Sequence, residues 1–109
     1  MLSDIFFDFD QSYIRKNERV NLEGNAKLLN VHYQNSTLLI EGHCDERGTI
    51  EYNLVLGERR AQAVKTYLVD LGIAAVKIQT TSYGKEKPFC TAHSVQCWQQ
   101  NRRAHFVLQ

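Results

Sequence analysis

The sequence predicts a two-layer sandwich in which two helices cover one face of a four-stranded β-sheet. The first observation is length, since 109 residues suffice for one domain with one hydrophobic core. The second is pattern: segments with strand-like alternation and segments with helical spacing follow one another along the chain. The resulting order is strand, helix, strand, helix, strand, connection, strand. Two strand–helix–strand units of this size form two layers, with a right-handed crossover between parallel strands.

The first half of the chain supplies a strand, a helix and a second strand. Ile5, Phe7 and Phe9 occupy alternate positions in Asp4–Asp10, which predicts a strand with aspartates near its carboxyl end. Leucine and alanine side chains at helical spacing predict a helix over Lys16–Tyr33. The apolar residues of Thr37–His43 predict the second strand, and Cys44–Gly48 is then the loop that follows it.

A second helix carries the clearest pattern in the sequence. Apolar side chains between Leu56 and Leu71 fall on one stripe of a helix that Tyr52 and Asn53 open. Gly72 directly follows the last apolar position, where a glycine commonly ends a helix. We expect this stripe to pack on the sheet.

The rest of the chain supplies two strands and a long connection. Val76–Thr81 alternates as a third strand, and Arg103–Leu108 forms the last strand. Ser82–Asn101 connects them and contains a short helical turn around Val95–Gln100. We interpret Trp98, within this connection, as a lid anchored over the core rather than as a binding platform.

Composition and charge exclude several classes of protein. Apolar residues make up 43% of the chain and charged residues 23%, which is ordinary globular usage and excludes wholesale disorder. Thirteen basic residues against 12 acidic ones give a net charge of +1, so no electrostatic argument favours nucleic acid or an anionic membrane surface. The start Met1–Asp4 lacks the basic and apolar regions of a signal peptide.

The cysteines leave two possibilities open. Cys90 and Cys97 lie seven residues apart in a polar stretch, and they form either a short disulfide or two free thiols. Cysteine and histidine are too few for a structural zinc site. His43 and Cys44 have the residue types of a catalytic pair, but neighbours in a strand point to opposite faces. We therefore expect neither a metal centre nor nucleophilic catalysis.

Arg60 is out of place in the apolar stripe of the second helix. A buried guanidinium requires a hydrogen-bonded partner, because burying it unpaired costs several kcal/mol. Asp45 is the nearest candidate in the predicted fold, since it follows the strand that leads into this helix. Asp8 and Asp10 reach the same region if the first two strands are neighbours.

Two interpretations of this charge cluster stay open. One is a structural ion pair that holds the helix on the sheet. The other is a pocket at the strand ends, where the Arg60 fork holds a ligand carboxylate and an aspartate holds a ligand ammonium. Such a pocket binds a zwitterion, for example an amino-acid head group. Asn53 either caps the helix or hydrogen-bonds that ligand.

Six ordered motifs carry a resemblance to a known family. They are Phe7–Asp10, Glu41–Thr49, Glu51–Leu54, Leu56–Ala61, Ser82–Pro88 and Asn101–Ala104. Each is weak alone, but together they span essentially the whole chain, which resembles the OmpA C-terminal-like family of peptidoglycan-binding domains. The resemblance implies one domain over residues 1–109. It also implies an α+β two-layer sandwich of order β-α-β-α-β-β, with a mixed four-stranded sheet and two main helices on one face.

The resemblance implies noncovalent binding of peptidoglycan through the diaminopimelate-type residue of the stem peptide, with no catalysis and no cofactor. In the family, the acid after the Gly-His-X motif holds the ligand amine, and the arginine of the Leu-Gly-Glu-Arg-Arg-Ala segment holds its carboxylate. The implied ligand-binding residues are Asp10, Asp45, Asn53, Arg60, and one of Arg102 and Arg103. We then expect Arg60→Ala to abolish cell-wall binding while sparing the fold.

The resemblance also implies a place in the cell. Such domains act in the periplasm, where they tether the outer membrane to the cell wall and engage the Tol system, notably TolB. A lipoprotein signal, an acylated cysteine and a tether are absent here, so we expect the soluble domain of a longer exported protein. An oxidising periplasm favours the Cys90–Cys97 disulfide, and we expect Cys44 to be a buried free thiol. The alternative function is a protein-docking module of the Tol system with little direct peptidoglycan affinity.

Overall fold

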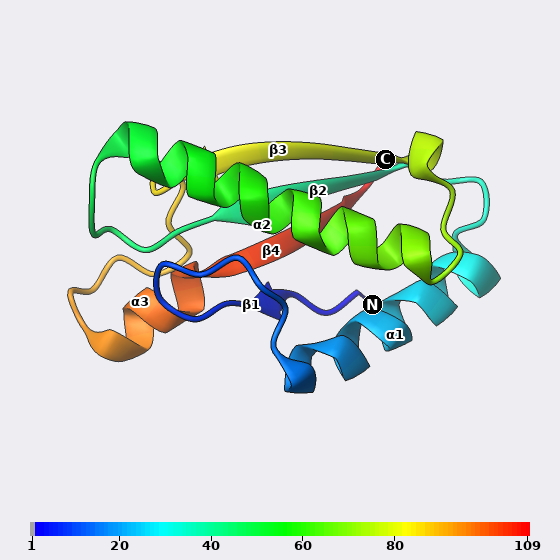
Figure 1. Ribbon diagram of the computed structural model, residues 1–109, viewed down its shortest axis with the longest axis horizontal. Coiled ribbons are helices and arrows are strands. Elements are labelled where there is room, and N and C mark those ends of the chain that lie inside the picture. Colours follow the sequence, from blue (N-terminus) through cyan, green and yellow to red (C-terminus); the bar gives the residue numbers. More distant parts are fainter. Residues whose placement is uncertain (1) are drawn as a thin grey trace.

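The structure is a computed structural model that describes residues 2–109. Its elements are β1 (Ile5–Phe6), α1 (Lys16–His32), β2 (Leu38–His43), α2 (Ile50–Asp70), a 3₁₀ turn (Ala75–Lys77), β3 (Ile78–Gly84), α3 (Val95–Asn101) and β4 (Arg103–Leu108). The predicted order of strands and helices is therefore confirmed (Figure 1). No helix in residues 2–109 combines the length and apolar character that a membrane span requires.

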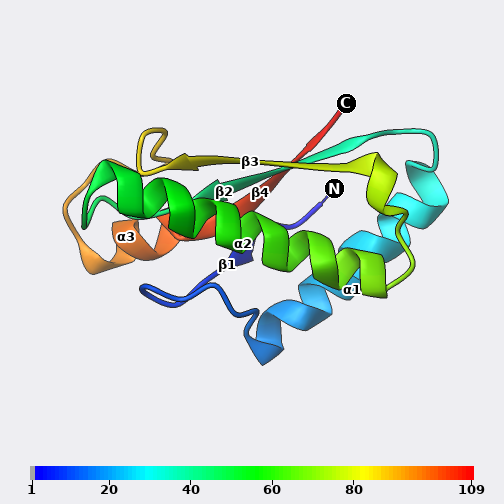
Figure 2. The same cartoon turned by 45° about the horizontal axis from the view of Figure 1, so that its top comes forward.

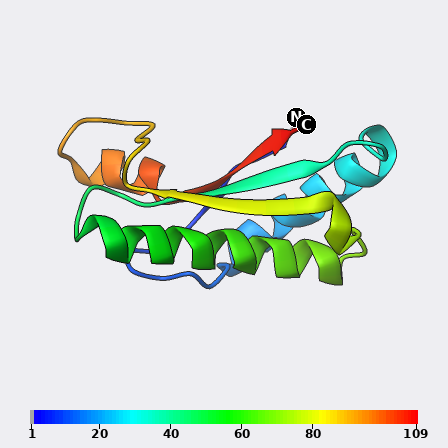
Figure 3. The ribbon, with the colours of Figure 1, turned by 90° about the horizontal axis from the view of Figure 1, so that it is seen from above.

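The four strands form one mixed sheet in the order β1-β4-β2-β3. β2 and β3 run parallel and are joined through α2, while β4 runs antiparallel to both β1 and β2. Seen along the sheet in Figure 3, α2 lies on one side of it, and buried side chains of α1 join those of α2 in the core on that side. The predicted α+β two-layer sandwich, with two main helices on one face, is thus confirmed.

The core lies between the sheet and the two helices. It contains Ile40 from β2, Val64 and Leu68 from α2, and Leu22 from α1, all of which are fully buried. Helix α2 contacts the sheet where Gly57 lies against Gly42 of β2, so closely that a Cβ on Gly42 would overlap the Gly57 backbone. Glycine is needed at this crossing because the two backbones touch.

The strand directions create one end of the molecule where the chain repeatedly leaves the sheet. β1, β2 and β3 all end there, and α2 and β4 begin there. Figure 2 shows the N-terminal half of α2, helix α3 and the segment after β1 gathered at this end. Side chains from distant parts of the sequence therefore meet beside the carboxyl ends of the strands, a common location for ligand sites in sheets with parallel strands.

The first strand is shorter than predicted, because its partner begins late. Asp4–Asp10 was expected to be a strand, but only Ile5–Phe6 pairs with β4, followed by one more hydrogen bond from Phe7 N to Arg102 O (2.9 Å). The residues that precede Arg102 belong to helix α3, so they offer no strand for Asp8 and the following residues to pair with. The chain turns instead, with Gln11 N donating to Asp8 O (3.2 Å).

Helix α1 supplies hydrogen bonds to the outer edge of β1. The buried Glu18 carboxylate accepts from Phe6 N (2.7 Å). Asn25, which is also buried, accepts from Ser3 N and donates to Ser3 O, both at 2.8 Å. A strand at the edge of a sheet presents unpaired backbone groups, and these two side chains satisfy them.

The third strand is displaced toward the C-terminus relative to the prediction. Val76–Thr81 was expected, but Ala75–Lys77 forms a 3₁₀ turn in which Val76 is 89% exposed, and β3 runs on to Gly84. β2 remains available as a parallel partner as far as His43, which pairs with Gly84. The extent of β3 is therefore set by the extent of its partner β2 and not by the alternation of apolar residues within β3 itself.

Candidate functional site

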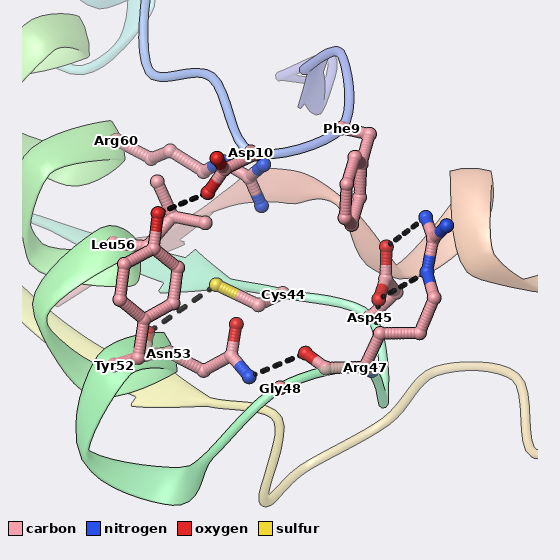
Figure 4. Close-up of a pocket in the computed structure, with 10 residues that line it drawn as sticks. All are labelled: Phe9, Asp10, Cys44, Asp45, Arg47, Gly48, Tyr52, Asn53, Leu56 and Arg60. Carbon is pink, nitrogen blue, oxygen red and sulfur yellow. Dashed lines mark hydrogen bonds and ion pairs between the residues drawn. The ribbon is translucent and has the colours of Figure 1, made fainter.

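A pocket of about 200 Å³ lies at the end of the sheet where β2 stops and α2 begins. Its lining is Phe9, Asp10, Cys44, Asp45, Arg47, Gly48, Tyr52, Asn53, Leu56 and Arg60 (Figure 4). Four of the predicted ligand-binding residues are among them: Asp10, Asp45, Asn53 and Arg60. The fold therefore brings together charged groups that lie up to 50 positions apart in the sequence.

Arg60 is fully buried, and its partners are backbone carbonyl groups rather than the expected aspartates. Its Nε, Nη1 and Nη2 donate to Gln11 O (2.9 Å), His43 O (2.9 Å) and Asp8 O (3.1 Å). Burial lowers the pKa of the guanidinium from its very high ordinary value. The carbonyls come from β2 and from the turn after β1, so Arg60 also ties these segments together, and we now expect Arg60→Ala to reduce stability as well as binding.

The same side chain keeps donors for a ligand. A guanidinium has five N–H groups, and in residues 2–109 three of those on Arg60 donate to the carbonyls. Figure 4 shows the guanidinium at the edge of the pocket beside Asp10. The other two N–H groups donate to none of these carbonyls, and the Cys44 thiol lies near the guanidinium.

Asp45 is a buried carboxylate whose partners are Arg47 and Arg102, rather than the Arg60 expected from the sequence. Arg47 donates from its backbone N (3.0 Å) and from Nε (3.1 Å) to Oδ1, and from Nη2 (2.9 Å) to Oδ2. Arg102 adds a longer contact from Nη1 to Oδ2 (3.4 Å). Burial alone would raise the pKa of Asp45, but the hydrogen bonds from Arg47 outweigh it and lower the pKa below its ordinary value.

The lowered pKa of Asp45 predicts an acid-dependent loss of stability. A carboxyl whose pKa is lower in the folded state contributes stability above its ordinary pKa, and this is lost as the pH falls through the folded-state value. We expect the free energy of unfolding to drop below about pH 4, and to drop less in Asp45→Asn. Urea unfolding of both chains at several pH values measures this difference, and identical pH profiles would contradict it.

Asn53 fastens the loop to the first turn of α2. The Thr49 hydroxyl caps the helix by accepting from Tyr52 N (3.1 Å), so Asn53 is not the cap. The Asn53 amide nitrogen donates instead to Arg47 O (2.8 Å) and Thr49 O (3.0 Å). In Figure 4 its amide oxygen points the other way, toward the pocket, where it is placed to accept from a ligand.

Asp10 lies across the pocket from this loop. It has a positive φ of 58°, the left-handed conformation that aspartate adopts in turns. The Tyr52 hydroxyl donates to its Oδ1, which raises the pKa of Tyr52. Asp10 is thus a second carboxylate of the site, and in Figure 4 it lies opposite Asn53.

The two arginines of the Asn-Arg-Arg motif point to opposite faces of the sheet. Arg102 reaches toward the pocket, where Nε donates to Phe7 O (2.9 Å) and Nη1 contacts Asp45. Arg103 donates to Asp4 (3.3 Å) on the face away from the helices, because it alternates along β4 with the buried Ala104. Arg103 is therefore excluded from the candidate site.

Comparison with known proteins gives the family. Residues 6–102 match the model of the OmpA family. The chain belongs to the OmpA family. The match runs from the second residue of β1 to just past α3, so the fold described above is that of an OmpA-family domain.

Several members of the OmpA family are close in sequence. The chain is 49% identical to the peptidoglycan-associated lipoprotein of Mesorhizobium japonicum and 50% identical to that of Rhizobium meliloti, over 95% of its length. These alignments cover 61% and 58% of the two relatives, so the chain spans about three fifths of their length.

Solved structures have the same fold. The crystal structure of the peptidoglycan-associated lipoprotein from Burkholderia pseudomallei matches with a TM-score of 0.90 at 42% identity, over 97% of this chain and 89% of that one. The C-terminal domain of Helicobacter pylori MotB matches with a TM-score of 0.92 at 18% identity, over 100% and 85% of the chains. The second likeness concerns the fold alone.

The sequence did not assign Arg47, or the aromatic residues Phe9 and Trp98 beside it, to the site. The Arg47 guanidinium lies between two aromatic rings, 3.8 Å from the centroid of Phe9 and 4.3 Å from that of Trp98. Trp98 was interpreted as a lid over the core, but its Nε1 donates to Glu46 (2.6 Å) in the loop before α2. The signal for Arg47 was present, since it follows Asp45 by two residues in a charged loop.

The cysteines take two different states. Cys90 and Cys97 are joined in a disulfide with Cα atoms 5.3 Å apart, which closes the segment that carries His93 beside Glu46. Cys44 is buried with a free thiol, and burial raises its pKa to about 11. It stays a neutral lining group of the pocket at physiological pH. In residues 2–109 no cluster of three histidine, cysteine or acidic side chains could hold a metal ion.

Proposed function

We propose that this domain binds peptidoglycan noncovalently, through the diaminopimelate-type residue of the stem peptide, and does not act on it chemically. The observation that carries the proposal is a buried arginine with free donors beside two carboxylates in one small pocket. An amino-acid head group carries a carboxylate and an ammonium, so it matches both signs of charge. The relatives' name, peptidoglycan-associated lipoprotein, supports the same ligand.

Each side chain then has a role set by its chemistry. Arg60 offers its two remaining N–H groups to the ligand carboxylate as a fork. Asp45 receives the ligand ammonium, and the Asn53 oxygen and Asp10 accept from the same region of the ligand. Arg102, which is tied to Phe7 O, orients Asp45 from behind. The arrangement supplies recognition, and it offers no activated nucleophile, because burial keeps the Cys44 thiol protonated.

The cellular setting is part of the proposal. We place residues 1–109 as a single domain of a periplasmic protein that is anchored in the outer membrane by a lipid and ties that membrane to the cell wall. The word lipoprotein in the relatives' names and the extra length of those relatives support this setting. We further propose that TolB and other Tol proteins are its partners, as in the Tol-Pal system of the cell envelope.

Asp45→Asn tests the proposed function at the residue that would hold the ammonium. The substitution removes a charge but keeps the shape, and we expect affinity for purified peptidoglycan to fall by about 30-fold or more, as when one partner of a buried charge pair is removed. Co-sedimentation of the purified chain with sacculi measures the loss. Asp70→Asn is the matched control, because Asp70 is exposed at the far end of α2.

Two outcomes would contradict the proposal. Equal sedimentation of Asp45→Asn and the wild-type chain would remove Asp45 from the site. Absence of sedimentation by the folded wild-type chain, together with tight binding to TolB, would favour the docking function instead.

A further inference from the structure

The Arg47 side chain has two sets of contacts with different character. Its guanidinium forms a bidentate pair with Asp45, through Nε to Oδ1 and Nη2 to Oδ2. Its Cζ also lies over the rings of Phe9 and Trp98, 3.8 Å and 4.3 Å from their centroids. Ring faces attract a cation without fixing its position, whereas the carboxylate fixes it. The pair with Asp45 is therefore what holds Arg47 in place.

Asp45 has no acceptor position left while Arg47 is there. A carboxylate offers about four lone-pair positions. Oδ1 accepts from the Arg47 backbone N and Nε, and Oδ2 accepts from Arg47 Nη2 and Arg102 Nη1. A ligand ammonium that reaches Asp45 has to replace one of these donors.

The charges of the pocket also favour replacement of Arg47 by the ligand ammonium. The pocket lining carries two carboxylates, Asp10 and Asp45, and two guanidinium groups, Arg47 and Arg60, so its charges balance. When a ligand carboxylate pairs with Arg60, the lining gains one negative charge. If Arg47 also leaves Asp45, the lining becomes more negative still, which favours the entry of the ligand ammonium.

Arg47 is also the least restrained of the three arginines Arg47, Arg60 and Arg102. Its side chain is 35% exposed, and it precedes Gly48, whose φ of 93° marks a tight turn in the loop. Arg102 is only 12% exposed, and Arg60 is fully buried and bound to three carbonyls. Both of these side chains are fixed by hydrogen bonds to backbone carbonyls, whereas the Arg47 side chain makes none within residues 2–109.

We propose that Arg47 is a displaceable counter-ion that covers Asp45 in the empty pocket and is replaced there by the ammonium of the ligand. This proposal deepens the proposed function and rests on it. Arg47 thereby affects specificity, because only a ligand with its own cationic group can replace the ion pair that Asp45 loses. A ligand without an ammonium leaves Arg47 where it is.

Trp98 reports on this displacement. It is the one tryptophan of the sequence, and its indole ring lies against the Arg47 guanidinium. Its Nε1 is held by Glu46, so the ring stays in place when the guanidinium moves. Removal of a cation from the ring face should change the fluorescence of Trp98, and that change should follow ligand occupancy.

The experiment compares the 109-residue chain with Arg47→Met, which keeps an unbranched apolar stem between the rings. A diaminopimelate-containing muropeptide, and the same muropeptide with that residue's free side-chain amine acetylated, are titrated into each by calorimetry and fluorescence. We expect Arg47→Met to bind the free-amine ligand about fivefold more tightly, the size of a partly exposed ion pair. Arg47→Met should bind the acetylated ligand no more tightly than the wild-type chain does. Its Trp98 fluorescence should not change when ligand binds. Arg19→Met, at an exposed position of α1, is the control.

The outcomes separate this proposal from the proposed function. Binding by the wild-type chain with unchanged Trp98 emission, or weaker binding of both ligands by Arg47→Met, would overturn the displacement and make Arg47 a positioning residue. Absence of binding by the wild-type chain would overturn the proposed function itself. If Arg47→Met does not fold, Arg47→Lys, which keeps the charge but loses the fork, should show a smaller gain. A loss in Arg47→Lys would overturn the proposal.

Discussion

Arg60→Ala is expected to abolish peptidoglycan binding and to lower the free energy of unfolding by about 3 kcal/mol or more. The substitution leaves three carbonyl oxygens, those of Asp8, Gln11 and His43, without their donors in a buried region. It also leaves a cavity where the largest fully buried side chain of residues 2–109 was packed. Urea unfolding measures the loss of stability, and co-sedimentation with sacculi measures binding.

The two effects of Arg60 are separable. Arg60→Lys keeps a positive charge and most of the stem but presents an ammonium in place of the planar fork. We expect it to retain more stability than Arg60→Ala and still to bind poorly, because a lysine that is bound to the carbonyls has no fork left for the ligand. Arg59→Ala is the matched control, since Arg59 is the exposed neighbour on the same helix. Stability and binding that match the wild-type chain in Arg60→Ala would contradict both roles.

Gly42→Ala is expected to cost about 3 kcal/mol or more of stability and to disrupt the pocket. A Cβ at this position would lie 1.7 Å from the carbonyl oxygen of Gly57 and 2.4 Å from its carbon. Both are backbone atoms, so no side-chain rotation relieves the overlap, and α2 has to move away from β2. Because α2 carries Asn53 and Arg60, binding should be lost together with stability.

A second glycine provides the control for this prediction. Gly24 lies in helix α1 with open space around it, since nothing is within 4 Å of a Cβ added there. Gly24→Ala is therefore expected to stabilise the chain by about 0.5–1 kcal/mol, the helix preference of alanine over glycine. Thermal or urea unfolding of the two variants compares them directly. A cost below about 1 kcal/mol for Gly42→Ala would show that the crossing of α2 and β2 tolerates more space than the structure has.

The elements that local pattern governs were predictable, and those that a distant partner governs were not. The apolar stripe of α2 predicts that Arg60 lies among buried residues, and Arg60 is indeed fully buried. The end of β1 depended on where β4 begins, and the end of β3 depended on how far β2 extends. Periodicity within a segment carries no information about the length of its neighbour.

The site shows the same division. The family motifs selected Asp45 and Arg60, and both line the pocket. Their hydrogen-bond partners could not be predicted, because Arg60 is held by carbonyl groups, which every residue possesses and no sequence pattern marks. The choice between Arg102 and Arg103 was settled by which of them alternates with the buried Ala104 along β4. Which residues of β4 face the helices can be seen only once the strand is placed in the sheet.

The most direct measurement is a calorimetric titration of the purified chain with two muropeptides that differ in one group. One contains diaminopimelate and the other contains lysine, which lacks the carboxylate proposed to bind Arg60. We expect saturable binding of the first and at least about tenfold weaker binding of the second, a difference of about 1.4 kcal/mol. Equal affinities would contradict recognition of the head group by Arg60, and no heat from either ligand with a folded chain would contradict peptidoglycan binding by this pocket.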